Sequence, residues 1–250
     1  IRRAGSREEE SRPLKKRSAA SLLARPAQVS ELAPGKEAAL VDETFRALMD
    51  GRDEELSALL VNLHLHGQTV AGIADRFLCA AMRRIGDLWH AGEISVAQEH
   101  VATRTAASAL RSLETAAGVA AGKKMLALCC SVEEDFHELP VRLAALTLEA
   151  GGFEVFRLGM STPFSALTEA LERFRPRLVC VSATVLVSVD RAAHEYAGFH
   201  KVARRRRARV VLGGAGFADA GVRRRLPADL HAESFRQLEA FIRTLDVSES

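Results

Sequence analysis

Between residue 36 and about residue 118, apolar residues recur every three or four positions, which is the period of an amphipathic helix. They form four runs, at about 40–49, 56–63, 69–90 and 95–113. Glycines, which helix ends favour, separate the runs: Gly51, Gly67 and Gly92. Ser95, with Gln98 three residues later, is a typical cap for the start of the fourth run. Four helices joined by short links predict a helix bundle.

After Gly118, short and continuously apolar segments replace the helical period. They predict strands at 125–132, 153–158, 178–182 and 209–212, and 226–231 is a candidate for a fifth. Helical segments alternate with them, at 138–150, 163–174, 188–205 and 234–245. Such alternation predicts a parallel sheet with helices on both faces. We therefore expect an α/β protein, in which a four-helix bundle precedes a flavodoxin-like (Rossmann-type) parallel sheet.

The chain thus divides into three parts. Residues 1–35 are rich in Arg, Lys, Glu and Ser without an apolar period, so we expect a flexible tail or linker. Residues 36–120 are expected to form the helical bundle, and residues 121–250 the parallel-sheet domain.

Composition narrows the class of protein. The 35 basic and 32 acidic residues leave a net charge of +3, so the chain as a whole is not a polycation for nucleic acid. The arginine clusters 204–207 and 223–225 lack interleaved aromatic residues, which favours a solvated face over a nucleic-acid patch. The four cysteines lie in apolar runs, as expected of buried free thiols in a reducing, cytoplasmic compartment. No apolar stretch reaches the roughly 18 residues of a membrane span, so no membrane partner is expected.

Three small motifs follow predicted strands: Asp135-x-His137, Ser182-x-Thr184 and Gly213-Gly214. The carboxyl ends of parallel strands share one edge of a sheet, where ligands of such folds bind. A loop histidine with a carboxylate two residues before it can bind a metal through one ring nitrogen while the carboxylate holds the other. The motifs therefore predict a metal or cofactor site at this edge.

Together, these motifs resemble the Asp-x-His-x-x-Gly, Ser-x-Leu and Gly-Gly signature of cobalamin-binding domains of the base-off/His-on type. Two positions depart from that signature. Pro140 replaces the glycine of the first motif, and the first turn of a helix tolerates proline. Thr184 replaces the leucine of the second. Neither residue is the expected metal ligand, so binding should persist.

The resemblance implies a role for each residue. His137 would be the lower axial ligand of cobalt, and Asp135 would hold His137 through a hydrogen bond. Ser182, with Thr184 nearby, would line the slot for the displaced nucleotide tail of the cofactor. Gly213 and Gly214 would let the backbone approach that tail.

The bundle carries a second resemblance. Trp89-His90 followed by Glu99-His100 is similar to the Trp…Glu-His pattern of CarH-type cobalamin-dependent photoreceptors, which are transcriptional regulators. By this resemblance, Trp89 would cover the upper face of cobalamin, and Glu99 and His100 would contact the upper ligand or its surroundings. His90 would be the upper cobalt ligand after photolysis. Plain core packing for Trp89 and a solvent-facing His90 are the structural alternatives.

These resemblances imply a light sensor rather than an enzyme. Adenosylcobalamin is the expected cofactor, with methyl- or hydroxocobalamin as alternatives. Photolysis of the Co–C bond would change the conformation or the homo-oligomeric state and so control transcription, through an upstream DNA-binding domain or a regulator protein as partner. The alternative function is a corrinoid methyl carrier of a methyltransferase system. Another tetrapyrrole, such as haem or a bilin, stays open as the chromophore.

Overall fold

The computed structural model describes residues 34–118 and 125–245. The tail expected at 1–35 therefore lies outside the described residues, except that helix α1 already begins at Pro34. The bundle consists of α1 (Pro34–Met49), α2 (Asp53–Leu65), a third helical run and α5 (Val96–Ala117). Leu48, Leu60 and Leu110 are among the fully buried residues of its core. This confirms the expected four helical runs.

The third run is one continuous rod that changes its winding. It comprises α3 (Val70–Ile73), the π-helical segment η2 (Ala74–Leu78) and α4 (Cys79–His90). Thr69 caps its start by accepting a hydrogen bond from the backbone N–H of Gly72, at 3.0 Å. A period of apolar residues cannot distinguish a π turn from an α turn, so the change of winding was not predicted.

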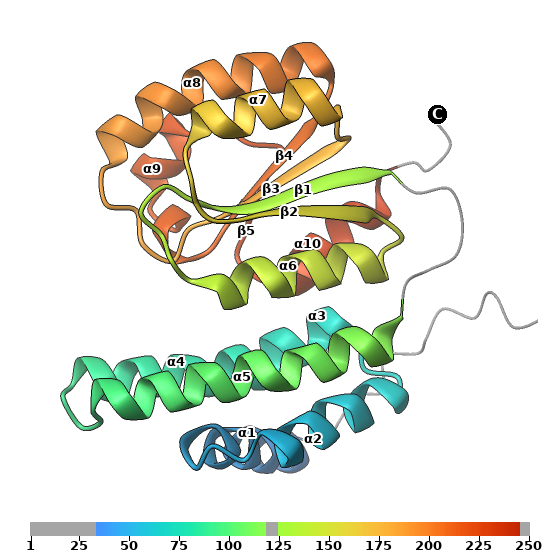
Figure 1. The fold of residues 1–250 in the computed structure, drawn as a ribbon, viewed down its shortest axis with the longest axis vertical. Helices are drawn as coiled ribbons and strands as arrows, with labels where there is room; N and C mark the ends of the chain where they lie inside the picture. Colours follow the sequence, from blue (N-terminus) through green and yellow to red (C-terminus); the bar gives the residue numbers. More distant parts are fainter. Residues whose placement is uncertain (1–33, 119–124, 246–250) are drawn as a thin grey trace, which may run out of the picture.

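The second domain is a sheet of five parallel strands in the order β2-β1-β3-β4-β5. The strands are β1 (Leu126–Val132), β2 (Glu154–Thr162), β3 (Leu178–Ser182), β4 (Arg209–Gly213) and β5 (Leu230–Ala232). Helices α7 (Phe164–Phe174) and α8 (Val189–Arg206) cover one face, and α6 (Glu138–Ala150) and α10 (Phe235–Arg243) cover the other (Figure 1). This order is that of a flavodoxin-like fold, and it confirms the expected fold class.

Two details of this domain differ from the expectation. Strand β2 continues to Thr162, four residues beyond the predicted end, because its pairing with β1 resumes after bulges near Cys130. A short helix, α9 (Ala220–Arg225), and the 3-10 turn η3 (Ala215–Phe217) follow β4 and were not predicted. Asp219 caps α9 by accepting hydrogen bonds from two backbone N–H groups, and six residues are too few to show a helical period.

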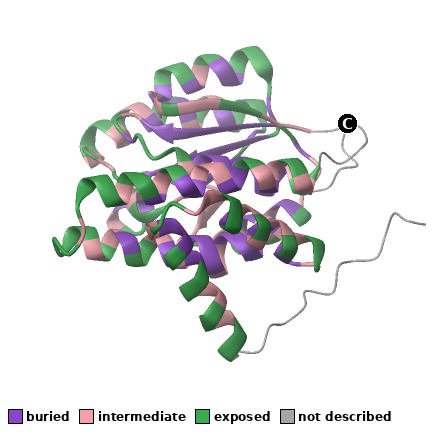
Figure 2. Ribbon diagram, turned by 60° about the horizontal axis from the view of Figure 1, so that its bottom comes forward, coloured by how far each residue is buried: buried purple, intermediate pink, exposed green. Residues whose placement is uncertain are grey.

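Helix α6 lies between the two domains. Its residues 141–148 are all buried, because one side of the helix packs on the sheet and the other on the bundle (Figure 1). In the molecule as a whole, buried residues gather where helices and strands face one another, and exposed residues line the outer sides of the helices (Figure 2). Val141 and Leu148 belong to the core against the sheet, whereas Leu143 and Leu146 belong to the bundle core. In the described ranges, every helix is too short or too polar to cross a lipid bilayer.

Candidate functional site

His137 lies in the loop between β1 and α6, one residue before that helix begins. Its Nδ1 is 2.6 Å from Oδ1 of Asp135, and its backbone N–H donates to the same oxygen at 3.1 Å. An ionised carboxylate only accepts hydrogen bonds, so Nδ1 carries a proton, and in the neutral ring Nε2 has the free lone pair. The His137 side chain is 54% exposed. Nε2 is therefore suited to bind a metal from outside the fold.

Asp135 is itself fixed by the ends of three strands. Its buried carboxylate accepts a third hydrogen bond, from the backbone N–H of Thr184 to Oδ2 at 2.7 Å. Its backbone carbonyl accepts from the Ser131 hydroxyl at 2.6 Å and from the backbone N–H of Ser161 at 3.0 Å. The loops after β1 and β3 thus hold the orienting carboxylate rigidly. Thr184 acts here through its backbone, not through the side chain that the sequence motif presents.

The ends of β3 and β4 are in close backbone contact next to this loop. Ser182 pairs with Gly213 in the sheet register, and the N–H of Ala183 donates to the Gly213 carbonyl at 2.9 Å. Gly214 has φ +105°, and a Cβ there would lie 2.4 Å from the carbonyl oxygen of Ala183. At Gly213 the nearest atom to a Cβ would be 3.5 Å away, an ordinary contact. The protein's own packing therefore requires glycine at 214 but not at 213.

The bundle residues lie at the turn between α4 and α5. Trp89 and His90 end α4, and both are exposed, Trp89 by 47%. Glu99, in the first turn of α5, accepts a hydrogen bond from Thr103 at 2.7 Å and lies 3.7 Å from the His100 ring. This turn and the carboxyl ends of the strands lie at the same end of the molecule (Figure 1). Trp89 is thus not a core residue, and the roles assigned to these four residues stay predictions.

Large apolar side chains are exposed at this same end. They follow β1 and β3 and flank the α4–α5 turn: Phe136, Val185, Val187, Trp89 and Val96. Exposed apolar side chains rimmed by polar groups are typical of a binding surface. Phe136, next to His137, is the most exposed of these five side chains, at 70%. The motifs did not single out Phe136, which lies within the first of them, or Ser131 and Ser161, which donate hydrogen bonds to the backbone carbonyl of Asp135.

The residues present fit a metal that arrives within a cofactor. Among the described residues, no three His, Cys, Asp or Glu side chains come together to hold a metal ion. Burial raises the pKa of the Cys130 thiol to about 12, so this cysteine stays a protonated, inert thiol. The site offers one imidazole held by a carboxylate, an apolar surface and a strand end with glycines. This arrangement suits a cofactor that supplies the remaining metal ligands itself.

Two sequence families, both described as B12 binding domain, match residues 40–114 and 125–234. Dimethylamine corrinoid protein 2 of Methanosarcina mazei is 24% identical over 66% of this chain and 77% of its own length. The HTH-type transcriptional repressors CarH and CarA of Myxococcus xanthus are 31% and 33% identical. They are matched over 46% and 59% of this chain but only 38% and 48% of their own lengths.

Among solved structures, the monomethylamine corrinoid protein of Methanosarcina barkeri superposes with a TM-score of 0.69 over 82% of this chain and 97% of its own. Its sequence is 20% identical, so this likeness concerns the fold. The two matched segments cover the bundle and the sheet, and they contain the bundle motif and the complete His137 site. The chain is therefore a cobalamin-binding protein of the B12 binding domain family.

Proposed function

We propose that this protein is a light sensor that uses adenosylcobalamin to control transcription, and that it acts as a regulator in the cytoplasm rather than as an enzyme. One observation carries the proposal: exposed Trp89 and His90 end α4 on the side of the molecule where the His137 loop lies (Figure 1). A carrier that passes its upper ligand to a partner has no use for a bulky indole at this position.

In the proposed site, the two domains hold the cofactor from opposite sides. His137 would hold the cobalt through Nε2, and Asp135 keeps the His137 ring in place. The strand ends around Ser182 and Gly214 receive the nucleotide tail. Trp89 would cover the bound cofactor on the bundle side and exclude water from it. Bound adenosylcobalamin supplies a Co–C bond that visible light cleaves.

Loss of the upper ligand would remove the surface on which Trp89 packs. A bound upper ligand would thus favour one bundle position over another. His90, the neighbour of Trp89, would be the candidate cobalt ligand once that upper ligand is lost. The signal then passes to a DNA-binding domain or to a regulator protein, with or without a change of homo-oligomeric state.

The test compares the adenosylcobalamin complex in the dark and after green light, by absorption spectrum and by elution volume in gel filtration. We expect both to change on illumination. The His90→Ala variant should bind in the dark like the wild type but give a different spectrum after light, whereas His137→Ala should lose the spectrum of histidine-bound cobalt already in the dark. Identical wild-type spectra and elution volumes before and after light would refute a sensor role.

A corrinoid methyl carrier is the second candidate, because the match to the dimethylamine corrinoid protein spans 77% of that relative. A carrier needs an upper face that opens to a methyltransferase. Methylcobalamin-loaded protein, incubated with a corrinoid methyltransferase and a thiol acceptor, would then lose its methyl group with turnover. Trp89→Ala should accelerate this loss if Trp89 covers the upper face, and leave it unchanged if the indole lies elsewhere.

A further inference from the structure

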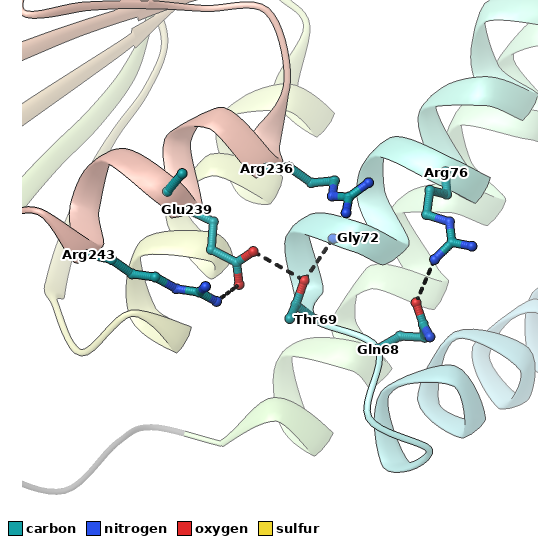
Figure 3. A pocket seen from close by; sticks show the side chains of 8 residues that line it. Gln68, Thr69, Gly72, Arg76, Arg236, Glu239 and Arg243 are labelled. Carbon is teal, nitrogen blue, oxygen red and sulfur yellow. Dashed lines mark hydrogen bonds and ion pairs between the residues drawn. The ribbon is translucent and has the colours of Figure 1, made fainter. Parts of the chain in front are cut away.

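A cavity lies between α10 and the start of the rod formed by α3, η2 and α4. Its volume is about 200 Å³. The residues that line it come from both domains, and Figure 3 shows most of their side chains: Gln68, Thr69, Gly72, Arg76, Arg236, Glu239, Ala240 and Arg243. None of the cobalamin-site residues described above lines this cavity.

The lining has an excess of positive charge. Arg76, whose side chain is 14% exposed, donates to Gln68 at 3.1 Å and to Glu37 at 3.0 Å. Arg243 pairs with Glu239 at 3.0 Å. Arg236 extends from α10 toward the bundle (Figure 3), and the described residues offer its side chain no ion pair or hydrogen bond. Three guanidinium groups thus meet a single carboxylate in the lining, and one of them has no partner.

The pKa of Glu37 is consistent with this excess of positive charge. The pKa of this carboxyl group is lowered, chiefly by its hydrogen bond from Arg76 and further by the charges of Arg76 and Arg236. Glu37 lies outside the cavity lining and accepts its hydrogen bonds from Arg76, so it offsets the charge of Arg236 only at longer range, without a hydrogen bond or ion pair to that side chain.

We infer that this cavity binds a small phosphate monoester. Guanidinium groups bind oxyanions through paired N–H donors. Arg236 offers its paired N–H donors, whereas Arg76 donates from Nε and Nη2 to Glu37 and from Nη1 to Gln68 and offers only its remaining N–H groups. The two arginines come from different helices, and a tetrahedral phosphate presents oxygens toward both, which a planar carboxylate does not. The cavity is smaller than the roughly 300 Å³ at which drug-sized ligand pockets begin, so it accommodates a phosphate with a short organic stem but not a nucleotide.

A ligand here would join the two domains. Arg236 and Arg243 belong to α10 of the sheet domain, whereas Gly72 and Arg76 belong to the bundle. Binding across this junction stabilises the arrangement in which the domains pack together. The inference does not depend on light sensing, because it concerns the apoprotein and residues remote from His137.

The test is calorimetric titration of the full-length apoprotein with glycerol 3-phosphate and with inorganic phosphate, at constant ionic strength. We expect one site per chain. The Arg236→Gln variant should weaken binding about 10- to 100-fold, the range for loss of charge-assisted hydrogen bonds. Gly72→Ala keeps every charge but places a Cβ 3.2 Å from Thr69 Oγ1, within the cavity, and should also weaken binding.

Arg206→Gln is the matched control, because Arg206 is an exposed arginine in the last turn of α8. It should bind like the wild type. Equal affinity of the wild type and Arg236→Gln, or no saturable heat with either phosphate, would overturn the inference. Malonate binding as tightly as glycerol 3-phosphate would overturn the assignment to phosphate.

Discussion

The carboxylate of Asp135 divides its two oxygens between two partners. Oδ1 accepts hydrogen bonds from the ring and the backbone N–H of His137, and Oδ2 accepts from the backbone N–H of Thr184. The sequence motif predicted the first contact. It could not predict the second contact, because nearly every residue type at position 184 would supply the same backbone N–H. The loop after β3 therefore helps to orient His137.

Asp135→Asn tests this division. An amide has one acceptor oxygen and one NH₂ group, so it must face one of the two donors with another donor. We expect the affinity for hydroxocobalamin to fall about 10- to 100-fold, as for other residues that orient a metal-bound histidine. Absorption titration measures this, with Asp50→Asn, an exposed carboxylate of the bundle, as the control. An unchanged affinity would mean that Asp135 does not orient His137.

A pair of glycine variants tests the strand end beside the site. Gly214→Ala combines φ +105° with a contact of 2.4 Å to a backbone oxygen that cannot rotate away. We expect it to lower the free energy of unfolding by about 1–3 kcal/mol in urea titrations. Gly198→Ala, in the middle of α8 with nothing within 4 Å of the new Cβ, should raise it by about 0.5–1 kcal/mol. Equal effects of the two variants would contradict this reading of Gly214.

At the scale of elements, the sequence predicted the helices that bury a long face of regularly repeated apolar residues. The bundle helices and α6 lie close to their expected positions because many apolar residues repeat along them. The last four residues of β2, Gly159–Thr162, contain no apolar run, and only their pairing with β1 makes them a strand. The candidate site was foreseen as motifs at strand ends, whereas the exposed Phe136 and the Ser131 hydrogen bond depend on how the loops fold.

Helix α10 has a cap that comes from the other domain. Both carboxylate oxygens of Asp75, in η2, accept backbone N–H groups at the start of α10, from Phe235 at 2.9 Å and from Arg236 at 2.8 Å. Such caps satisfy N–H groups that have no partner within the helix, and a carboxylate there also interacts favourably with the helix dipole. The π-helical segment thus contributes directly to the junction between the domains.

Asp75→Ala should therefore lower the free energy of unfolding by about 1–2 kcal/mol and speed amide hydrogen exchange in residues 235–243. The loss stays moderate because Ser234 also caps this helix. Asp42→Ala, which breaks an exposed ion pair with Arg84, should change stability by less than about 0.5 kcal/mol. Exchange in α10 as slow as in the wild type would contradict a cap across the domains.

At the scale of the whole molecule, α6 connects the His137 loop to the bundle. His137 immediately precedes α6, and the helix is packed on both sides, so a displacement of this loop acts on both domains. The helix period predicted an apolar α6 but gave no reason to expect a buried arginine in it. Arg142 is buried because Glu114 and the carbonyl oxygen of Ala107, both on α5, accept its hydrogen bonds.

Arg142→Met tests how strongly this contact joins the domains. The change keeps an unbranched side chain of similar length but leaves the partly exposed Glu114 with only Arg157, at 3.4 Å. We expect the free energy of unfolding to fall by about 1–3 kcal/mol, less than for a fully buried pair because water reaches Glu114. Arg205→Met, which breaks an exposed pair with Glu172, should be nearly neutral.

Two probes then follow the two domains separately during urea unfolding of Arg142→Met. Trp89 is the only tryptophan in the chain and lies in the bundle, so its fluorescence reports the bundle, whereas circular dichroism reports both domains. If α6 transmits stability through Arg142, the fluorescence midpoint should fall below the midpoint by circular dichroism in this variant alone. Coincident midpoints at the wild-type urea concentration would mean that apolar packing of Leu143 and Leu146 suffices to hold the bundle on the sheet.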